Sequence, residues 1–318
     1  TELGLPSSEV FDILQDKRGY MWFATDHGVA RYNGKEFKSY TISDGLLDNT
    51  VLRMCEDRKG RIWFVSQSNE LCYWQNDSIC TTPASDAFRP QTNSYNVVSR
   101  IYLDSLDNIW ISGRTNIFFA DAKQNYREFK ELVSKGKDST YTYELRIVDK
   151  TVLFGYNVRN KAYKYLGQPV VNLSFNYHKN GTPDRIIPFT VTKAMATLPF
   201  INGAFGYRAK TDTYYFSEDS LIVSIHNGSI NSNRLGRSII NIVTDRNDDI
   251  WVCFHKGGVA FYKDGDFNRE PITFLQHVSV DDVEVDHEGG IWIATLEKGV
   301  YYVPSSSILF LFTRMFLT

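Results

Sequence analysis

Five of the six tryptophans in this 318-residue chain occupy the same place in a repeated sequence pattern. In each copy an aspartate stands six residues before the tryptophan, with a turn between the two. The pairs are Asp16–Trp22, Asp57–Trp63, Asp104–Trp110, Asp245–Trp251 and Asp286–Trp292. Adjacent copies lie 41 to 47 residues apart, and a fixed period of this size indicates a repeat architecture.

Each copy predicts a set of short antiparallel strands. The runs before the aspartates, at residues 10–14, 51–55 and 280–285, have the period of two and the β-branched residues that are typical of strands. The aspartate then begins a turn that ends in glycine or asparagine, which accept a positive φ. A tryptophan strand, a second turn and a third strand follow. The hairpin turns Asn33-Gly34 and Asp264-Gly265 then lead to a fourth strand.

One repeat is therefore predicted to be a four-stranded antiparallel meander, which is the size of a β-propeller blade. The fold class is all-β, and the whole of residues 1–318 is predicted to form a single propeller domain.

Two motifs resemble a known family. Residues 4–34 contain Gly-Leu-Pro-Ser-Ser, Asp-x-x-Gly-x-x-Trp-Phe-Ala-Thr and Gly-Val-x-Arg-Tyr-Asn-Gly, and residues 44–51 contain Asp-Gly-Leu-Leu-Asp-Asn-Thr-Val. These runs resemble the two-component regulator propeller repeat, and the five copies with their spacers cover most of the chain. The resemblance implies a propeller in the extracytoplasmic sensor part of bacterial histidine kinases, often hybrid ones that respond to glycans. It also implies a periplasmic or cell-surface location and a second propeller or kinase module as a partner.

The middle of the chain is less regular. Residues 145–155 and 204–216 have the same hairpin pattern with a shortened turn, and residues 175–200 are expected to hold the last strands of a fourth blade plus a long loop. Seven hairpins result, near Trp22, Trp63, Trp110, Leu153, Tyr214, Trp251 and Trp292. Seven blades of about 45 residues fit a propeller, and six blades is the alternative if the middle holds only one.

The two ends of the chain are predicted to meet. The first copy begins without the fourth strand that precedes the motif elsewhere, and Ile308–Phe312 at the far end could supply it. Sealing the ring avoids an open sheet edge, which invites pairing with other chains. The polar segment at residues 81–94 contains proline and is predicted to be a surface loop.

Composition excludes some partners and leaves others open. A net charge of −2 gives no steering toward nucleic acid, and no apolar stretch is long enough to span a membrane as a helix. Cys55 and Cys253 fit small buried strand positions. Cys72 and Cys80 flank a turn without standing directly opposite each other, so the cysteines do not show whether the protein resides in an oxidising or a reducing compartment. A homodimer is also left open.

The sequence contains no recognisable catalytic constellation, cofactor motif or metal site. Neither a nucleophile elbow nor a phosphate-binding loop is present, and the six histidines do not pair at metal-ligand spacing. Residues 245–249 superficially resemble a calcium loop, but they lack its glycine and its late glutamate. They are interpreted as a structural turn, and the domain is predicted to be non-catalytic.

Turn geometry suggests where a ligand would bind. In a meander, successive turns alternate between the two sides of the ring. The Asp-x-x-Gly turns share one side, here called the repeat-turn side, and the turns after the tryptophan strands share the other, here called the rim side. The rim turns vary from copy to copy, and a scaffold that keeps its core constant while one set of loops varies usually binds there.

The candidate ligand contacts are Arg114, Arg159, His255 and Lys256 as polar groups, and Trp74 and Tyr207 as stacking platforms. The alternative is that each is an ordinary solvated loop residue. The resulting hypothesis is a non-catalytic sensor propeller that binds a glycan or another small ligand on one face. Two further hypotheses are a protein-interaction scaffold at the cell envelope and a propeller lyase or hydrolase.

Overall fold

The computed structural model describes residues 4–88, 98–103, 107–113, 117–121, 123, 125–129, 141–148, 151–158, 173–177, 183–188, 204–226 and 229–304. Its contacts divide the chain into two compact units. Unit 1 comprises Thr1–Tyr40 with Gly203–Thr318, and unit 2 comprises Thr41–Asn202. The single-domain expectation therefore stays a prediction. Within the described ranges, no helix is long and apolar enough to cross a membrane.

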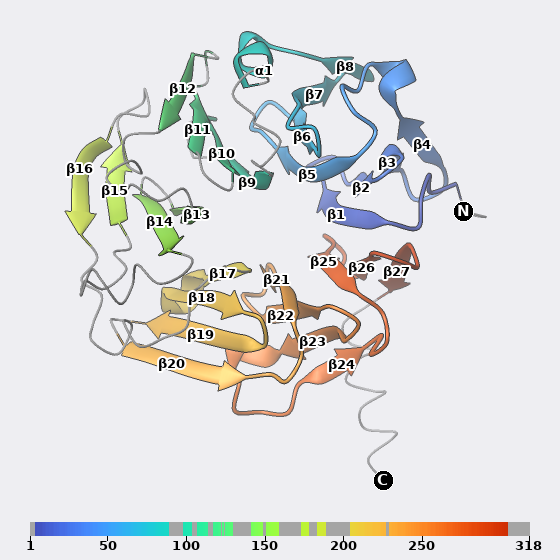
Figure 1. The fold of residues 1–318 in the computed structure, drawn as a ribbon. Helices are drawn as coiled ribbons and strands as arrows, with labels where there is room; N and C mark the ends of the chain where they lie inside the picture. The colour runs from blue at the N-terminus through green and yellow to red at the C-terminus, as the bar shows by residue number, and fades with distance from the viewer. Residues whose placement is uncertain are drawn as a thin grey trace. The chain divides into compact units, whose positions relative to one another are not determined.

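Unit 1 contains four antiparallel sheets in which each strand pairs with its neighbours in sequence (Figure 1). The first sheet contains β1 (Val10–Gln15), β2 (Met21–Thr25), β3 (Gly28–Tyr32) and β4 (Phe37–Tyr40). The fifth contains β17 (Phe205–Arg208), β18 (Thr213–Glu218), β19 (Leu221–His226) and β20 (Ser229–Arg234). The sixth contains β21 (Ile239–Thr244), β22 (Ile250–Phe254), β23 (Gly258–Tyr262) and β24 (Ile272–Phe274). The seventh contains β25 (Val280–Val285), β26 (Ile291–Thr295) and β27 (Val300–Val303).

Unit 2 contains three sheets of the same kind and one short helix. The second sheet contains β5 (Val51–Glu56), β6 (Ile62–Ser66), β7 (Leu71–Gln75) and β8 (Ser78–Cys80), and the helix α1 (Pro83–Phe88) follows it. The third contains β9 (Val98–Leu103), β10 (Ile109–Gly113), β11 (Ile117–Ala120) and β12 (Tyr126–Phe129). The fourth contains β13 (Tyr141–Val148), β14 (Thr151–Val158), β15 (Leu173–Tyr177) and β16 (Pro183–Pro188).

These sheets are the blades of an all-β propeller, as the repeat predicts. In the described part of the chain, six sheets have four strands and the seventh has three. The seven residues predicted to mark the hairpins all lie on the second strand of a sheet, from Trp22 on β2 to Trp292 on β26. The predicted last strands of the fourth blade are β15 and β16. The predicted strand at Ile308–Phe312 lies outside the described residues.

The six-residue spacing of the repeat has a direct physical cause. One carboxylate oxygen of the aspartate accepts two backbone N–H groups of the turn. For Asp16 the donors are Arg18 at 2.9 Å and Tyr20 at 3.0 Å. The other oxygen accepts the indole N–H of the tryptophan. The Nε1–Oδ2 distances are 2.9 Å for Trp22–Asp16, 3.1 Å for Trp63–Asp57, 3.0 Å for Trp251–Asp245 and 2.9 Å for Trp292–Asp286. The aspartate thus closes the turn and also anchors the next strand, a bond that sequence reasoning did not foresee.

Sheets next to one another in unit 1 are joined by side chains on their inner strands. A β-bulge shifts the register of β25 between Val280 and Asp282. The buried Asp282 carboxylate accepts the Asn241 amide of the sixth sheet at 3.2 Å and the Ile13 backbone N–H of the first sheet at 3.1 Å. One carboxylate therefore connects three sheets.

The first and seventh sheets pack against each other, as predicted for the two ends of the propeller. The Phe23 ring lies 5.7 Å from the Trp292 ring, and the backbone N–H of Gly299 donates to the Ser8 carbonyl at 2.8 Å. Both contacts lie in unit 1, so closure between the first and last sheets is part of that unit.

The segment at residues 81–94, predicted to be a surface loop, contains a buried helix in its described part, residues 81–88, and its remainder lies outside the described residues. The segment contains α1, whose Ala84 and Phe88 are each 1% exposed. The Phe88 ring meets the Phe118 ring edge-on at 4.8 Å, so the helix belongs to the core of unit 2. The apolar pair at i and i+4 is the signal that could have revealed it.

Cys253 is buried, as predicted, whereas Cys55 is only partly buried. Cys80 pairs in register with Tyr73 rather than with Cys72, so the two thiols point to opposite faces of the sheet. None of Cys55, Cys72, Cys80 and Cys253 forms a disulfide bond. Burial raises the pKa of the Cys72 thiol to about 12, so this group is unreactive.

Candidate ligand-binding rim

Four residues on the rim side of unit 1 form one hydrogen-bonded group, here called the rim cluster: His255, Lys256, Ser279 and Glu297. The Ser279 hydroxyl donates to Glu297 Oε1 at 2.7 Å, and the Ser279 backbone N–H donates to Oε2 at 3.0 Å. The Lys256 backbone N–H donates to Ser279 Oγ at 3.1 Å, and His255 Nδ1 lies 3.4 Å from the same oxygen. The turn after β22 is thereby joined to the turn after β26.

The rim cluster presents both signs of charge to solvent. Hydrogen bonds from Ser279 lower the pKa of the Glu297 carboxyl, and the nearby His255 and Lys256 side chains lower it further. Glu297 is therefore an anion at neutral pH. His255, Lys256 and Glu297 are exposed, whereas Ser279 is fully buried. Because its hydroxyl proton is directed at a carboxylate, Ser279 acts as a connector and not as a nucleophile.

Backbone hydrogen bonds fix the rim turns to the neighbouring sheet. The N–H of Gly258 donates to the Val278 carbonyl at 2.8 Å, and that of Ile239 donates to the Asp219 carbonyl at 2.7 Å. Gly258 has a φ of +72°, and a Cβ there would lie 2.0 Å from the Phe274 carbonyl oxygen. Only glycine fits this approach, and the exposed side chains of the rim cluster consequently extend from a fixed backbone.

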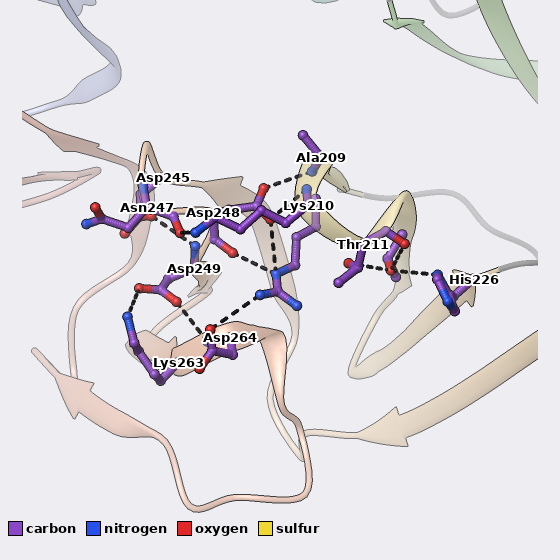
Figure 2. A network of polar contacts seen from close by, with 12 residues as sticks. Ala209, Lys210, Thr211, His226, Asp245, Asn247, Asp248, Asp249, Lys263 and Asp264 are labelled. Atoms are coloured by element: carbon purple, nitrogen blue, oxygen red, sulfur yellow. Dashed lines mark hydrogen bonds and ion pairs between the residues drawn. The ribbon is translucent and has the colours of Figure 1, made fainter.

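The repeat-turn side of unit 1 carries a different kind of network, in which side chains bond to the backbone of the next sheet (Figure 2). Asp248 accepts the backbone N–H groups of Ala209 at 2.8 Å and Lys210 at 3.0 Å. Arg208 returns a bond from Nε to the Asp248 carbonyl at 2.7 Å and contacts Asp264 at 3.4 Å. This network joins the fifth and sixth sheets, and its bonds from side chain to backbone make it a structural clamp between them.

A half-buried glutamate stands at the same junction of inner strands as Asp282. Burial raises the pKa of Glu284 to about 8, and the charge of Asp282 adds to the effect, while Arg246, 3.9 Å away, opposes it. Glu284 therefore keeps its proton to a higher pH than an ordinary glutamate does. Asp286 and Asp245 are the other charged groups that raise its pKa.

Four of the six predicted contact residues lie in the part of the chain that the structure describes. His255 and Lys256 lie together in the rim cluster. Arg114 and Arg159 lie outside the described residues.

The prediction that Trp74 and Tyr207 lie on the rim side is corrected, because the structure places neither residue there. Trp74 pairs with Ile62 at the repeat-turn end of β7 and is only 2% exposed, so it offers no ring face to a ligand. Tyr207 pairs with Tyr214, also at the repeat-turn end, and its hydroxyl donates to Asp212 at 3.0 Å. The prediction rested on residue type alone, whereas the strand register determines that each ring lies at the repeat-turn end of its strand.

Ser279 and Glu297 were missed as partners of the predicted pair. No sequence signal marked them: a small hydroxyl residue stands immediately before β5, β21 and β25, but the rim turns bond to its backbone carbonyl, which any residue could supply. Each of these residues accepts a backbone N–H from a rim turn: Gln67 to Thr50 at 2.8 Å, His255 to Ser238 at 2.9 Å and Leu296 to Ser279 at 3.0 Å. Within the described ranges, no group of three or more His, Cys, Asp and Glu side chains is placed to hold a metal ion.

Comparison with solved structures finds the same fold at low identity. The extracellular domain of the putative hybrid two component system BT4673 from B. thetaiotaomicron is 16% identical with a TM-score of 0.65, covering 94% of this chain and 38% of that one. A catalytically inactive virginiamycin B lyase from Staphylococcus aureus, solved with quinupristin, is 13% identical with a TM-score of 0.67, covering 94% and 97%. PorZ, a surface component of the type-IX secretion system of Porphyromonas gingivalis, is 12% identical with a TM-score of 0.67, covering 96% and 48%.

At these identities the three likenesses concern the fold alone, and this chain spans well under half of the BT4673 domain. No curated protein matches the sequence.

The fold and its repeated Asp–Trp link define a β-propeller built from tandem blades. Residues 4–27 and 45–68 match the two component regulator propeller family, and the first two blades therefore carry the repeat of that family. The sequence resemblance is confirmed at the same motifs.

Proposed function

We propose that this chain is the sensor propeller of a two-component regulatory system and that its ligand binds on the rim side, at the rim cluster. The family of the first two repeats and the propeller fold shared with BT4673 support the sensor role. The observation that carries the ligand site is the rim cluster itself. Exposed His255 and Lys256 are held beside the Glu297 carboxylate by a buried serine, on a turn fixed to the next sheet. A site already ordered in this way loses little entropy on binding.

The proposed ligand is an oligosaccharide or another small polar molecule that reaches the propeller outside the cytoplasm. Glu297 accepts hydrogen bonds from hydroxyl groups, and Lys256 and His255 donate to hydroxyl or carboxylate oxygens. The two rings predicted as stacking platforms lie elsewhere. Recognition at this site therefore rests on hydrogen bonds and charge rather than on ring stacking.

The test is thermal unfolding of the purified chain during titration with soluble malto-, xylo-, arabino- and manno-oligosaccharides. A ligand at 100 times its Kd stabilises the folded state by about 2.7 kcal/mol, which raises Tm by about 5 °C or more in a chain of this size. His255→Ala combined with Lys256→Ala removes that shift. His287→Ala combined with Lys17→Ala is the matched control, because both of these residues are exposed on the repeat-turn side.

A shift that survives the rim substitutions contradicts the proposed site. A flat response to every oligosaccharide in a folded protein contradicts the glycan proposal and favours a protein partner, as in the scaffold hypothesis. Turnover of an oligosaccharide during the titration would instead support the lyase or hydrolase hypothesis, for which the likeness to virginiamycin B lyase supplies only the fold.

A further inference from the structure

A half-buried arginine, Arg237, lies against the rim turn that carries His255 and Lys256. It belongs to the connection between β20 and β21, which is on the rim side because β22 ends there and β21 runs antiparallel to β22. The Ser238 carbonyl next to it accepts the backbone N–H of His255 at 2.9 Å. Arg237 Nη1 donates to the Gly257 carbonyl at 2.8 Å. The guanidinium is therefore anchored on the residue that directly follows Lys256.

The stem of Arg237 packs closely on this turn. A Cβ at Gly257 would lie 2.8 Å from Arg237 Cδ and 2.8 Å from Phe254 Cβ, so only glycine leaves room for the arginine. The guanidinium carbon lies 5.8 Å from the centroid of the Phe254 ring, within the range of a cation–π contact. These contacts restrict the side chain before a ligand arrives, and a donor ordered in advance loses little entropy on binding.

One edge of this guanidinium has no protein partner within the ranges that the structure describes. Nη1 is used by Gly257, whereas Nε and Nη2, which together form a separate edge, make no hydrogen bond or ion pair there. Arg208 on the repeat-turn side gives the contrast, because its guanidinium contacts Asp248 and Asp264 at 3.4 Å each. The two N–H groups of such an edge match the two oxygens of a carboxylate.

The charges of the rim cluster also favour an anionic group beside Arg237. Arg237 and Lys256 carry positive charge. Glu297 is the carboxylate of the cluster, and both of its oxygens already accept hydrogen bonds from Ser279. Asp219 on the preceding rim turn is exposed, and within the described structure it forms no ion pair with Arg237. A carboxylate supplied by a ligand would therefore neutralise a cation that the described part of the protein leaves unpaired.

We propose that Arg237 binds a carboxylate of the rim ligand through Nε and Nη2, which makes the ligand an acidic oligosaccharide containing uronic acid. This inference rests on the proposed function, because it adds a contact residue to the same site and names the chemical class of its ligand. His255, Lys256 and Glu297 then bind the hydroxyl groups of the same oligosaccharide, as at a neutral sugar.

Paired ligands test the role of the ligand charge. Oligomers of galacturonic, mannuronic and glucuronic acid are added to the neutral oligosaccharides, each together with its methyl ester, which keeps the ring and its free hydroxyl groups but not the charge. Calorimetric titration of the purified chain at constant ionic strength measures each Kd. The acid that binds is expected to do so about 10- to 100-fold more tightly than its ester, as for the loss of a hydrogen bond to a charged group.

Substitutions of Arg237 test the residue. Arg237→Gln keeps an N–H donor for the Gly257 carbonyl but removes the charge, and it is expected to lower the affinity for the acid about 10- to 100-fold and leave that for the ester unchanged. Arg237→Lys keeps the charge without the planar fork, so its affinity for the acid is expected to lie between the two. Arg269→Gln is the matched control, because Arg269 lies on the repeat-turn side of the same sheet, 74% exposed and paired with Asp266. It is expected to change neither affinity.

The outcomes separate this inference from the proposed site. Equal affinity for acid and ester, an equal loss of both in Arg237→Gln, or binding of neutral oligosaccharides alone overturns the inference. The rim site itself stands in those cases if His255→Ala combined with Lys256→Ala still abolishes binding. Binding that survives this double substitution, or no binding of any oligosaccharide to the folded protein, overturns the proposed site and the inference together.

Discussion

The bond between the repeat aspartate and the tryptophan indole is predicted to be a main source of stability within each blade, and Asp16→Ala measures it. The substitution removes the acceptor of four hydrogen bonds. Three come from the backbone N–H groups of Arg18 and Tyr20 and from Trp22 Nε1, and the fourth is a longer bond of 3.4 Å from the half-exposed Arg18 guanidinium. Asp16 and Trp22 are both fully buried, so water cannot readily replace the carboxylate at the indole.

The magnitude follows from what each donor loses. A buried donor left unpaired costs about 1–3 kcal/mol, and each of the two turn amides, which regain some water, costs about 1 kcal/mol. The expected loss is about 4 kcal/mol, which lowers Tm by about 8 °C or more. Asp16→Asn keeps one acceptor oxygen but places an amide N–H₂ group against the indole N–H, so about half of that loss is expected.

The assay is thermal and urea unfolding followed by circular dichroism. Because the chain has two compact units, two transitions are expected, and only the one that belongs to unit 1 should move. A double-mutant cycle of Asp16→Asn with Trp22→Phe isolates the indole bond, with an expected coupling of about 1 kcal/mol. Lys35→Ala, on an exposed loop, is the control and should change stability by less than about 0.5 kcal/mol. A loss below about 1 kcal/mol in Asp16→Ala, or additive effects in the cycle, would refute the reasoning.

Three further predictions concern the junctions between sheets in unit 1. Asp282→Ala leaves the Ile13 amide without its acceptor and is expected to cost about 2–3 kcal/mol; unchanged hydrogen exchange at Ile13 would contradict this. The pKa of Glu284 is about 8 in the folded protein and about 4.5 in the unfolded chain. The free energy of unfolding of the unsubstituted protein therefore falls as pH rises between these two values. Glu284→Gln should remove that fall, which is on the order of 2 kcal/mol once the 28% exposure of the side chain to solvent is allowed for. Parallel plots of unfolding free energy against pH for the two proteins would contradict this prediction. Arg208→Met is expected to cost about 1–2 kcal/mol in urea unfolding through loss of the bond to the Asp248 carbonyl, and a cost near zero would show that the network in Figure 2 is not a clamp.

The hairpins were predictable because the interactions that make them are local. The bond from Asp16 to Trp22 spans six residues, and the turn between them needs only a residue that accepts a positive φ, such as Gly19 at +90°. The same logic found the irregular hairpins at Leu153 and Tyr214, where the tryptophan is absent but the period-two pattern on both sides of a turn remains.

The candidate site was predictable only in part. Variation among the rim turns pointed to His255 and Lys256, but their partners Ser279 and Glu297 stand 18 residues apart in the next blade. Residue type suggested Trp74 as a stacking platform, yet its place on β7 buries it among side chains that no local pattern identifies. The short helix α1 carried a local signal in its apolar pair Ala84 and Phe88, but its place in the core became visible only in the tertiary structure.

The sequence by itself determined the repeat, its hairpins and the family whose model the first two copies match, because the turn, the strand period and the Asp–Trp bond all act within one blade. The tertiary structure decided which side chains are buried, which end of a strand faces the rim and how neighbouring sheets are joined. The bond from Ile13 to Asp282 connects residues 269 positions apart. Contacts of that kind depend on the curvature and stacking of whole sheets, and a pattern of neighbouring residues carries no information about them.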